Sequence, residues 1–292
     1  MPEVCEVALL CEYLITKLKN RKIVNAKILS GKYANDGLNL ELLINATIDN
    51  IESKGKFLWF TLKTDNKYVY FMNWFGLSGY WSFKKSSVDR IAIAILTDYN
   101  KKYTLYFSDQ RNFALMQITH DANLLNKKIQ SLAPDLLKSN ITTNDFVDLF
   151  NIYLHKFPRR KHIAIVDLLL RQDIDDGVVS GIGNYLSAEI LYRASISPFR
   201  EINSLTHNEI VKLARASRTT VKLCYFYNKT PYITKINIKP DKFINYHEDI
   251  NISGQDFNFL VYRKKTDLLG NIVVNNIVAK NRTTYWVPNV QK

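Results

Sequence analysis

Apolar residues near the start of the chain recur three and four positions apart, at Val7, Leu10, Cys11, Leu14 and Leu18. This spacing predicts a helix with one apolar face, ending in the charged run KLKNRK. From there to about residue 120 the pattern is that of β-strands. The segment KYTLYFSD alternates apolar and polar positions, whereas FLWFTL, YVYFMNWF and RIAIAIL are continuous apolar runs of strand length. Short strands with brief turns predict an antiparallel β-sandwich or barrel behind the leading helix.

The pattern changes in SLAPDLLKSN, where Pro134 indicates a linker, and helical spacing follows. One helix is expected in TTNDFVDLFNIYL, and another in LTHNEIVKLARA, where Thr206 stands three residues before Glu209 as in a capping box. A further helix is expected over Tyr185–Ala194. Near the C-terminus, FNFLVYRKK, a turn around LLGN and a second run through TTYWVP predict a β-hairpin with a basic lining. The fold class is therefore α+β.

Composition narrows the class of protein without deciding its function. The chain has 292 residues, of which 47% are hydrophobic, as expected for a folded globular protein. No stretch reaches the roughly 18 apolar residues of a membrane span. Glu3 and Glu6 stand where a signal peptide carries basic residues, so a soluble intracellular protein of the cytoplasm or nucleus is expected. The net charge of +13 suits a polyanionic partner, although a chain rich in Lys, Asn and Ile could also reflect an AT-rich genome.

Cysteine and histidine positions argue against a metal site. Cys5, Cys11 and Cys224 contain no C-x-x-C pair and cannot form a zinc site by themselves. The five histidines are scattered without the spacing of metal ligands. We therefore expect buried, reduced thiols, no bound metal and no cofactor.

The N-terminal sequence MPEVCEV places a proline where a free chain terminus can form. Methionine ahead of a small residue is normally removed, which would leave Pro2 with a secondary amine. The pKa of a terminal amine is about 7.7–8.0, so an appreciable fraction is neutral and nucleophilic near pH 7. Such an amine can attack a sugar C1′ and form an iminium, and Glu3 and Glu6 supply carboxyl groups nearby. The alternative is that Pro2 is simply a good first residue for a helix.

Two further motifs contain residues suited to contacting nucleic acid. In ESKGKFLWF, Lys56 leads into a buried strand, where it is either a solvated amine or a ligand. In YFSDQRNFALM, Arg111 and Phe113 are two apart and would share a face of a strand. A cation beside an apolar wedge suits insertion into a base stack when a nucleotide is extruded. A core phenylalanine with a surface arginine is the alternative.

The segment VVSGIGNYLSAEILYRASISP combines a glycine turn with the start of a helix. Gly181 and Gly183 predict a tight turn, and the N–H groups behind it, with the Asn184 amide, form a possible phosphate site. Glycines also allow helices to pack closely, which is the alternative. The segment lacks the third glycine and the acidic residue of a dinucleotide fold, so an NAD site is not expected.

These motifs together resemble one family. The N-terminal Pro-Glu, the Gly-Lys turn, Arg-x-Phe, GIGNYLSAEILYRA and the terminal NRTTYW occur in the order found in the formamidopyrimidine-DNA glycosylase/endonuclease VIII family of base-excision repair enzymes. The resemblance runs from residue 2 to residue 288, and the stretch Gly181–Pro198 is its most specific part. The hairpin without cysteines is similar to the zincless finger of one branch, which includes giant-virus members.

The resemblance implies a domain organisation and a partner. Residues 1–130 would form a β-sandwich catalytic domain, 131–250 a helical helix–two-turn–helix DNA-binding domain, and 251–292 a zincless finger. The partner would be damaged or abasic DNA, single- or double-stranded, bound by a monomer. Base release would be followed by β- and then δ-elimination, which nicks the strand.

The resemblance also implies roles for individual residues. Pro2 would be the nucleophile at C1′, Glu3 would assist ring opening and proton transfer, and Glu6 would order the first helix and the amine. Lys56 would act beside the catalytic pair. The residues implied to grip phosphates are Lys56, Asn184 and Arg282, and those implied to fill the vacated stack are Leu77 in the GLSG turn, Arg111 and Phe113.

Departures from the family pattern leave three hypotheses open. The family usually opens P-E-G-P-E, whereas this chain has Val4 and Cys5, and glycine at position 4 would give the backbone more freedom. Ala114 replaces a usual glycine, and RQDIDDG replaces a Leu-Asp-Gln-type sequence. A bifunctional glycosylase/AP lyase explains Pro2, Glu3 and Lys56. A catalytically impaired protein that binds damaged or abasic DNA is the main alternative, and an RNA-binding protein would leave Pro2 and Glu3 unexplained.

Overall fold

The structure, a computed structural model, describes residues 2–97, 101–236, 238, 240, 242–278 and 281–292. The chain divides into two compact units, each assembled from segments that are distant in the sequence. The first unit comprises Met1–Pro2, Glu6–Gln130 and Thr230–Lys242, and the second comprises Glu3–Cys5, Ser131–Lys229 and Phe243–Lys292. The second unit thus contains residues of both predicted C-terminal domains, 131–250 and 251–292.

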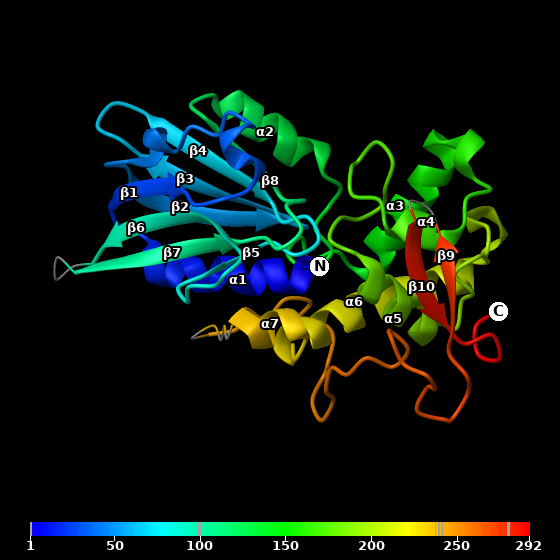
Figure 1. Cartoon of the computed structure of the whole chain (residues 1–292). Coiled ribbons are helices and arrows are strands. Elements are labelled where there is room, and N and C mark those ends of the chain that lie inside the picture. Colours follow the sequence, from blue (N-terminus) through cyan, green and yellow to red (C-terminus); the bar gives the residue numbers. More distant parts are fainter. Residues whose placement is uncertain (1, 98–100, 237, 239, 241, 279–280) are drawn as a thin grey trace. The chain divides into compact units, whose positions relative to one another are not determined.

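The first unit contains two antiparallel four-stranded sheets, as the strand patterns predict (Figure 1). One sheet has the order β1-β6-β7-β5 and the other β2-β3-β4-β8. The strands are β1 (Ile23–Ile28), β2 (Thr47–Lys54), β3 (Phe57–Lys63), β4 (Tyr68–Trp74), β5 (Tyr80–Ser82), β6 (Asp89–Leu96), β7 (Lys102–Ser108) and β8 (Leu115–Thr119). The four strand segments quoted from the sequence are all confirmed, and they form β3, β4, β6 and β7.

Trp81 of β5 lies at the centre of the core that the two sheets share. It is fully buried, and its ring contacts Phe60 and Phe71 of the second sheet with centroids 5.7 and 5.9 Å away. Its indole N–H donates to Asn73 Oδ1 at 3.1 Å, which satisfies a buried amide. These contacts explain why the apolar runs face inward, and they confirm a sandwich of two sheets.

Helices complete the first unit. They are α1 (Val4–Leu18), α2 (Ala122–Ser131), α7 (Pro231–Ile236) and the 3₁₀ turns η1 (Lys32–Ala34) and η2 (Leu40–Leu43). Helix α1 confirms the predicted N-terminal helix but starts at Val4 instead of Val7, because the residues before Val7 are also buried. Helix α2 is not among the elements that the sequence pattern predicts, and its one buried apolar residue is Leu125.

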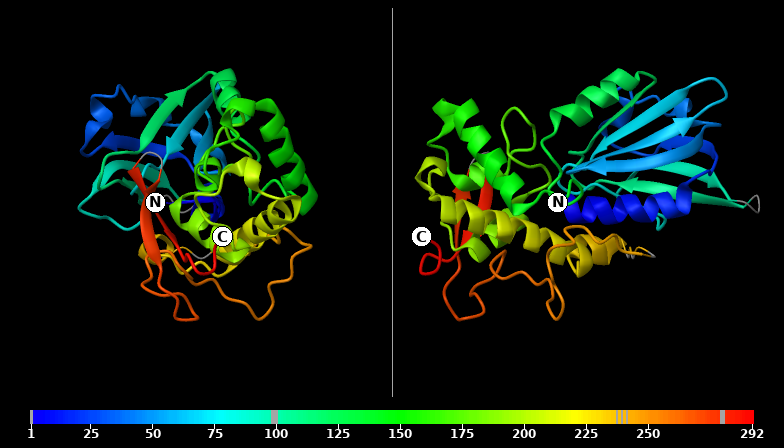
Figure 2. Two further views of the ribbon diagram at one scale, coloured as in Figure 1. Left: turned by 90° about the vertical axis from the view of Figure 1, so that its right-hand side faces the viewer. Right: turned by 180° about the vertical axis from the view of Figure 1, so that it is seen from behind.

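The second unit is mainly helical (Figure 2). Its helices are α3 (Thr143–Lys156), α4 (Ile165–Leu169), α5 (Asn184–Ala194) and α6 (His207–Phe226), with 3₁₀ turns η3 (Pro158–Arg160) and η4 (Ile202–Ser204). Helix α6 packs against α3 and α5. Both long helices start at capping boxes, Thr142 with Asp145 and Thr206 with Glu209, and the second confirms the prediction.

The segment around Pro134 is packed, so the prediction of a linker there is wrong. Leu136 and Leu137 are fully buried, and Ser180 N–H donates to the Pro134 carbonyl at 2.8 Å. The Asp135 carboxylate accepts the N–H groups of Leu137 and Lys138, both at 2.8 Å. Pro134 therefore lies just ahead of a turn over residues 136–139 that is anchored by Asp135.

The C-terminal hairpin is formed by β9 (Val274–Val278) and β10 (Arg282–Trp286). The prediction that FNFLVYRKK supplies its first strand is wrong, because the structure has no strand over 257–265. The Glu189 carboxylate accepts the N–H groups of Leu260, Val261 and Tyr262 at 2.9–3.1 Å, so these donors are not available to a sheet. The base of the hairpin packs on α5, where Ala188 meets Val261 and Val287.

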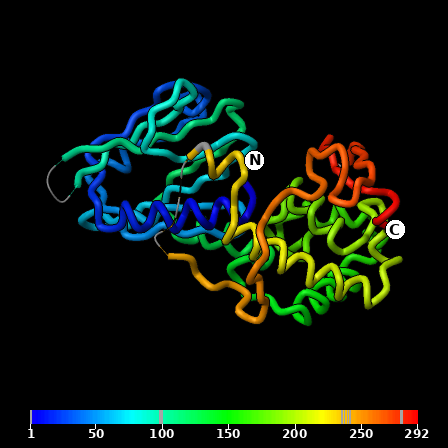
Figure 3. The backbone as a smooth tube through the Cα atoms, turned by 90° about the horizontal axis from the view of Figure 1, so that it is seen from below, coloured from blue at the N-terminus to red at the C-terminus, as the bar shows by residue number. Residues whose placement is uncertain are grey.

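Before the hairpin, the chain over 243–273 runs beside the helices of the second unit without a helix or strand of its own (Figure 3). Lys222 of α6 anchors part of this segment. Its ammonium group donates to Asn245 Oδ1 at 3.1 Å and to the carbonyls of His247 and Ile250 at 2.8 and 2.9 Å. Burial lowers the pKa of this lysine, and the three acceptors offset the cost of burying the charge.

Candidate active site

Glu3 is held by the N-terminus of α5. Its carboxylate accepts the N–H groups of Gly183 at 2.6 Å, Tyr185 at 3.0 Å and Leu186 at 3.2 Å. The first N–H groups of a helix have no partner within the helix and carry the positive end of its dipole. The Glu3 side chain is buried and therefore acts as the anionic ligand of this helix end.

The two glycines before α5 are required by the N-terminal segment that packs on them. A Cβ at Gly183 would stand 2.4 Å from the Glu3 carboxyl carbon, and one at Gly181 would stand 2.5 Å from Val4 Cβ. Gly181 also has φ +109, a backbone conformation that favours glycine. The Val4 N–H donates to the Gly181 carbonyl at 3.0 Å. The G-x-G motif therefore allows close approach of residues 3 and 4.

Val4 itself begins α1 with helical backbone geometry. It is not among the residues with positive φ, so the backbone at this position does not need the freedom of glycine. Cys5 is fully buried, and its thiol donates to the Val221 carbonyl at 3.4 Å. Both departures from the family opening are accommodated by packing.

Gln172 fixes the glycine turn from the other side, although it is not among the residues predicted from the sequence. Its Oε1 accepts the Gly181 N–H at 2.8 Å, and its Nε2 donates to the Ile182 carbonyl at 3.0 Å. Gln172 belongs to RQDIDDG, the segment noted as a departure from the family pattern. Gln172 stands nine residues ahead of Gly181, and no local pattern in the sequence links the two.

Asn184 and Arg282 lie on elements that pack together. Asn184 is the first residue of α5, with Gly183 as N-cap, and β10, which begins at Arg282, packs on α5. The Asn184 Oδ1 atom is buried without a hydrogen-bond partner among the described residues. Arg282 lines a hollow of about 310 Å³ together with Gln172. The second unit therefore brings Glu3, Asn184 and Arg282 to the surroundings of one glycine turn.

Glu6 lies in the first unit, where it contacts the start of α7. It is fully buried, and Thr230 Oγ1 donates to its Oε1 at 3.0 Å. Tyr232 of α7 donates its hydroxyl to the Gly79 carbonyl at 3.2 Å. Burial and the negative charge of Glu6 raise the pKa of Tyr232 well above its usual value, so this hydroxyl stays protonated. Pro2 lies two residues before Val4, the first residue of α1, and is buried.

Lys56 lies in the two-residue turn between β2 and β3, behind Gly55, whose φ is +57. The lysine is half-buried. This placement agrees with the predicted turn before a buried strand. The catalytic role of Lys56 stays a prediction.

Leu77, Arg111 and Phe113 are exposed at two neighbouring turns of the first unit. Leu77 is 41% exposed and Phe113 57%, so both present apolar surface to solvent. The expectation that Arg111 and Phe113 share the face of a strand is wrong, because both lie in the turn between β7 and β8. Asn112 between them has φ +55, which breaks the alternation of a strand.

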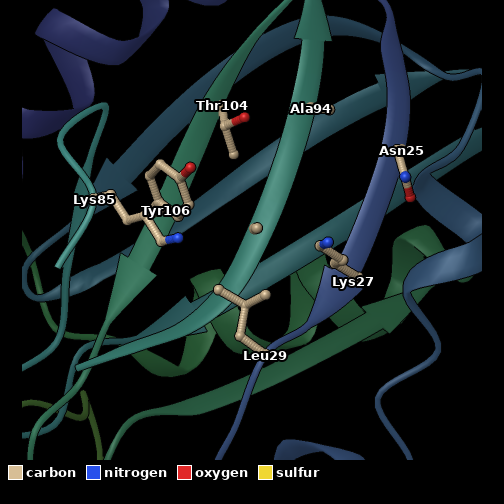
Figure 4. A pocket seen from close by; sticks show the side chains of 8 residues that line it. Asn25, Lys27, Leu29, Lys85, Ala94, Thr104 and Tyr106 are labelled. Carbon is tan, nitrogen blue, oxygen red and sulfur yellow. The ribbon is translucent and has the colours of Figure 1, made fainter. Parts of the chain in front are cut away.

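A second hollow lies on the outer face of the β1-β6-β7-β5 sheet, away from these residues. Its volume is about 230 Å³, with Ala92 and Ala94 among the residues that line it. Figure 4 shows Lys27 of β1 and Lys85 on either side of β6, with Tyr106 of β7 next to Lys85. None of the candidate site residues lines this hollow.

Comparison with known proteins identifies the family. Residues 1–116 match the formamidopyrimidine-DNA glycosylase N-terminal domain, and residues 248–292 match the C-terminal domain of the same enzyme. Together the two matches cover more than half of the chain. The protein belongs to the formamidopyrimidine-DNA glycosylase family. The match at both ends agrees with the resemblance found in the sequence, whereas the zincless-finger branch and the similarity to giant-virus members stay predictions.

Individual relatives extend the likeness over the whole chain. A formamidopyrimidine-DNA glycosylase of Prochlorococcus marinus (strain MIT 9515) is 28% identical over 324 residues, covering 100% of both chains. The enzyme of Wolbachia sp. subsp. Brugia malayi is 28% identical over 232 residues, covering 76% of this chain and 77% of its own.

Solved structures of the family share the fold. The MutM (Fpg) protein of Thermus thermophilus has a TM-score of 0.75 at 22% identity, covering 99% of this chain and 98% of its own. Lactococcus lactis Fpg, solved with DNA that contains an abasic site, has a TM-score of 0.75 at 18% identity and covers 99% of both chains. The mixed α+β fold is therefore that of formamidopyrimidine-DNA glycosylases.

Within the described part of the chain, no helix is long and apolar enough to cross a bilayer. Among the same residues, no three His, Cys, Asp or Glu side chains gather in a way that could hold a metal ion. The three cysteines are buried and have reduced thiols.

Proposed function

We propose that this protein is a bifunctional DNA glycosylase and AP lyase that removes oxidised bases from DNA. The observation that carries the proposal is the fixed carboxylate of Glu3, the residue that follows Pro2 in the sequence. The carboxylate that follows the proline is buried and held by three N–H groups at the start of α5. A charged group fixed next to a terminal secondary amine suits proton transfer during covalent catalysis.

In the proposed reaction, the Pro2 nitrogen attacks C1′ of the damaged nucleotide. The C1′–N bond to the base breaks, and the base leaves with the electron pair and takes up a proton. Opening of the sugar ring gives an iminium between Pro2 and C1′, with Glu3 assisting proton transfer to O4′. Loss of a C2′ proton then expels the 3′ phosphate, and a second elimination expels the 5′ phosphate. Hydrolysis of the iminium restores the amine.

The proposed DNA contacts use the two other groups of residues. Asn184 and Arg282, on packed elements of the second unit, would hold phosphates with Lys56 of the β2–β3 turn. The net charge of +13 supports a polyanionic ligand. Leu77, Arg111 and Phe113 would fill the space left by the extruded nucleotide, a role that their exposed apolar surfaces suit.

Borohydride trapping tests this function. The purified protein is mixed with DNA that contains an abasic site, borohydride is added, and the adduct is mapped by peptide mass spectrometry. We expect a covalent adduct on residue 2, because borohydride reduces an iminium to a stable amine, and a smaller yield with Pro2→Ala. Mass spectrometry of the free protein should show that Met1 is absent, since an uncleaved methionine turns the reactive amine into an amide.

Two outcomes would overturn the mechanism. Either the parent protein gives no adduct, or the adduct lies on a lysine such as Lys56. Tight binding of abasic DNA without any adduct would instead support the alternative, a binding protein whose catalysis is impaired. Packing of Val4 against Gly181 without strain at position 4 argues for the enzyme.

A further inference from the structure

The turns that carry Leu77 and Phe113 touch each other through their backbones. Gly76 precedes Leu77 with φ +60, and a Cβ at Gly76 would stand 2.6 Å from the Phe113 carbonyl carbon and 2.7 Å from the Ala114 nitrogen. The turn between β4 and β5 therefore rests directly on the turn between β7 and β8. We call these two turns, residues 75–79 and 109–114, the wedge turns.

A buried carboxylate joins the wedge turns. Asp109 is fully buried, and its Oδ1 accepts the Ser78 hydroxyl at 2.5 Å. Its Oδ2 accepts the Ala114 N–H at 2.9 Å, directly after Phe113. The Ser78 oxygen in turn accepts the Arg111 N–H at 3.1 Å. One side chain thus fixes Ser78 after Leu77, and fixes the backbone on both sides of Phe113.

Tyr33 supplies a further donor to the same carboxylate. Its hydroxyl donates to Asp109 Oδ2 at 3.1 Å, and its ring packs edge-on against Phe107 with centroids 6.3 Å apart. Burial, followed by the negative charge of Asp109, raises the pKa of Tyr33 above its ordinary range, so the phenol remains a donor at any working pH. Arg90 holds the same residue from its backbone, because its Nε–H donates to the Asp109 carbonyl at 2.8 Å.

We propose that Asp109 is a positioning residue that holds Leu77, Arg111 and Phe113 at a fixed spacing, so that they enter a base stack as one rigid wedge. This inference rests on the proposed function, because a wedge matters only if a nucleotide is extruded. The physical reason is preorganisation. Ordering two independent turns on binding costs free energy, whereas turns that are already joined by charge-assisted hydrogen bonds incur little of that cost.

The inference predicts an effect that depends on the form of the DNA. Duplex DNA has a stack that must be filled when a nucleotide leaves it, and single-stranded DNA does not. Asp109→Asn replaces one acceptor oxygen with an NH₂ group that faces a donor, so the wedge turns lose their common anchor. We expect this variant to nick abasic duplex about 10–100-fold more slowly than the parent, as expected for displaced positioning groups. Its trapping on single-stranded abasic DNA should be unchanged.

Asp89→Asn is the matched control. Asp89 is also buried, at the start of β6, and its carboxylate accepts the Ser108 hydroxyl at 2.5 Å and the Ser86 N–H at 2.8 Å. Its partners lie outside the wedge turns. Any general weakening of the sheet by loss of a buried carboxylate should therefore be the same in both variants.

Fluorescence of 2-aminopurine supplies a readout that a merely structural role would not move. The probe is placed opposite a tetrahydrofuran site in a duplex, and its emission rises when a side chain unstacks it. We expect the parent and Asp89→Asn to raise the emission equally at saturating protein, and Asp109→Asn to raise it much less. Thermal melts show that each variant is folded.

The outcomes separate this inference from the proposed function. The inference about Asp109 is wrong if folded Asp109→Asn gives the emission of the parent and nicks duplex DNA at the rate of the parent. It is also wrong if Asp89→Asn loses as much emission and duplex nicking as Asp109→Asn. If Asp109→Asn does not fold, Ser78→Ala, which removes one bond of the anchor, must show the same loss on duplex DNA alone. Failure of the parent to trap either form of DNA would overturn the lyase mechanism, yet the emission measurements would still test the wedge.

Discussion

Glu3 and Glu189 are both buried carboxylates that accept three backbone N–H groups, but the origin of the donors differs. The donors to Glu3 belong to the first turn of α5, at Gly183, Tyr185 and Leu186. Glu189 lies in the middle of α5, and its donors come from a remote loop, at Leu260, Val261 and Tyr262. The same residue type with the same number of bonds therefore performs two different tasks around one helix.

The electrostatic settings explain the difference. Glu3 meets the positive end of a helix dipole, which favours its negative charge. Glu189 lies in the middle of α5, and burial raises its pKa in spite of the three hydrogen bonds. Only Glu3 stands next to Pro2 in the sequence. Glu189 serves to fasten the loop that precedes the hairpin, so a change at each position should have a different signature.

Replacing Glu3 should give the largest effect, and the effect should be on chemistry. We expect Glu3→Gln to slow base release from a duplex with an oxidised base by about 10²–10⁴-fold, the usual range for a positioned acid or base. Single-turnover kinetics measures this step apart from product release. A parental rate for this variant would remove Glu3 from the mechanism.

Gly183→Ala tests the position of Glu3 without changing its charge. The new Cβ would stand 2.4 Å from the Glu3 carboxyl carbon, so the carboxylate has to move. We expect a smaller loss in the same single-turnover rate, about 10²-fold or less, as for a catalytic group displaced by an ångström. Gly183 has no positive φ, so the alanine introduces no backbone strain that could mimic the effect. A rate equal to that of the parent would mean that the carboxylate does not need this position.

Replacing Glu189 should affect stability and leave catalysis intact. Glu189→Gln places an NH₂ group against N–H donors, which should lower the free energy of unfolding by about 1–3 kcal/mol. Denaturant titration measures this loss. The rate of base release by the folded variant should equal that of the parent, in contrast to Glu3→Gln. A parental stability would show that the three hydrogen bonds are replaced by others.

The same variant gives a smaller, pH-dependent signal. Because the folded-state pKa of Glu189 is raised, its stabilising contribution is fully present below the unfolded value of about 4.3 and declines as pH rises through the folded value. The stability gap between the parent and Glu189→Gln should therefore be wider at acidic pH than at neutral pH. A gap that widens with rising pH would contradict the direction of this shift.

The sequence predicted those parts of the fold in which burial follows a simple period. Alternation and apolar runs identified β3, β4, β6 and β7, and capping chemistry identified the start of α6. Helix α2 was missed because its apolar face is narrow. The segment FNFLVYRKK has the composition of a strand, but Glu189 takes its N–H groups, and a partner about seventy residues away leaves no local signal.

The candidate residues could be proposed from motifs, whereas the residues that hold them could not. Gln172 and Asp109 act through backbone groups of turns, and nothing in the spacing of the chain distinguishes them from ordinary polar residues. The interpretation of Arg111 and Phe113 as a strand pair failed because one residue between them has a positive φ. Such single-residue conformations depend on tertiary contacts, which the sequence pattern does not contain.

The Glu189 anchor also affects the order in which the protein folds. Its three hydrogen bonds join positions 71 to 73 residues apart, so they can form only after a long loop has closed. Helix α5 and its contacts with α6 are more local and should form earlier. We expect the amide hydrogens of Leu260–Tyr262 to exchange faster than those of α5 and α6. Such exchange would mean that this segment opens first and releases the hairpin from α5 while the helices remain intact.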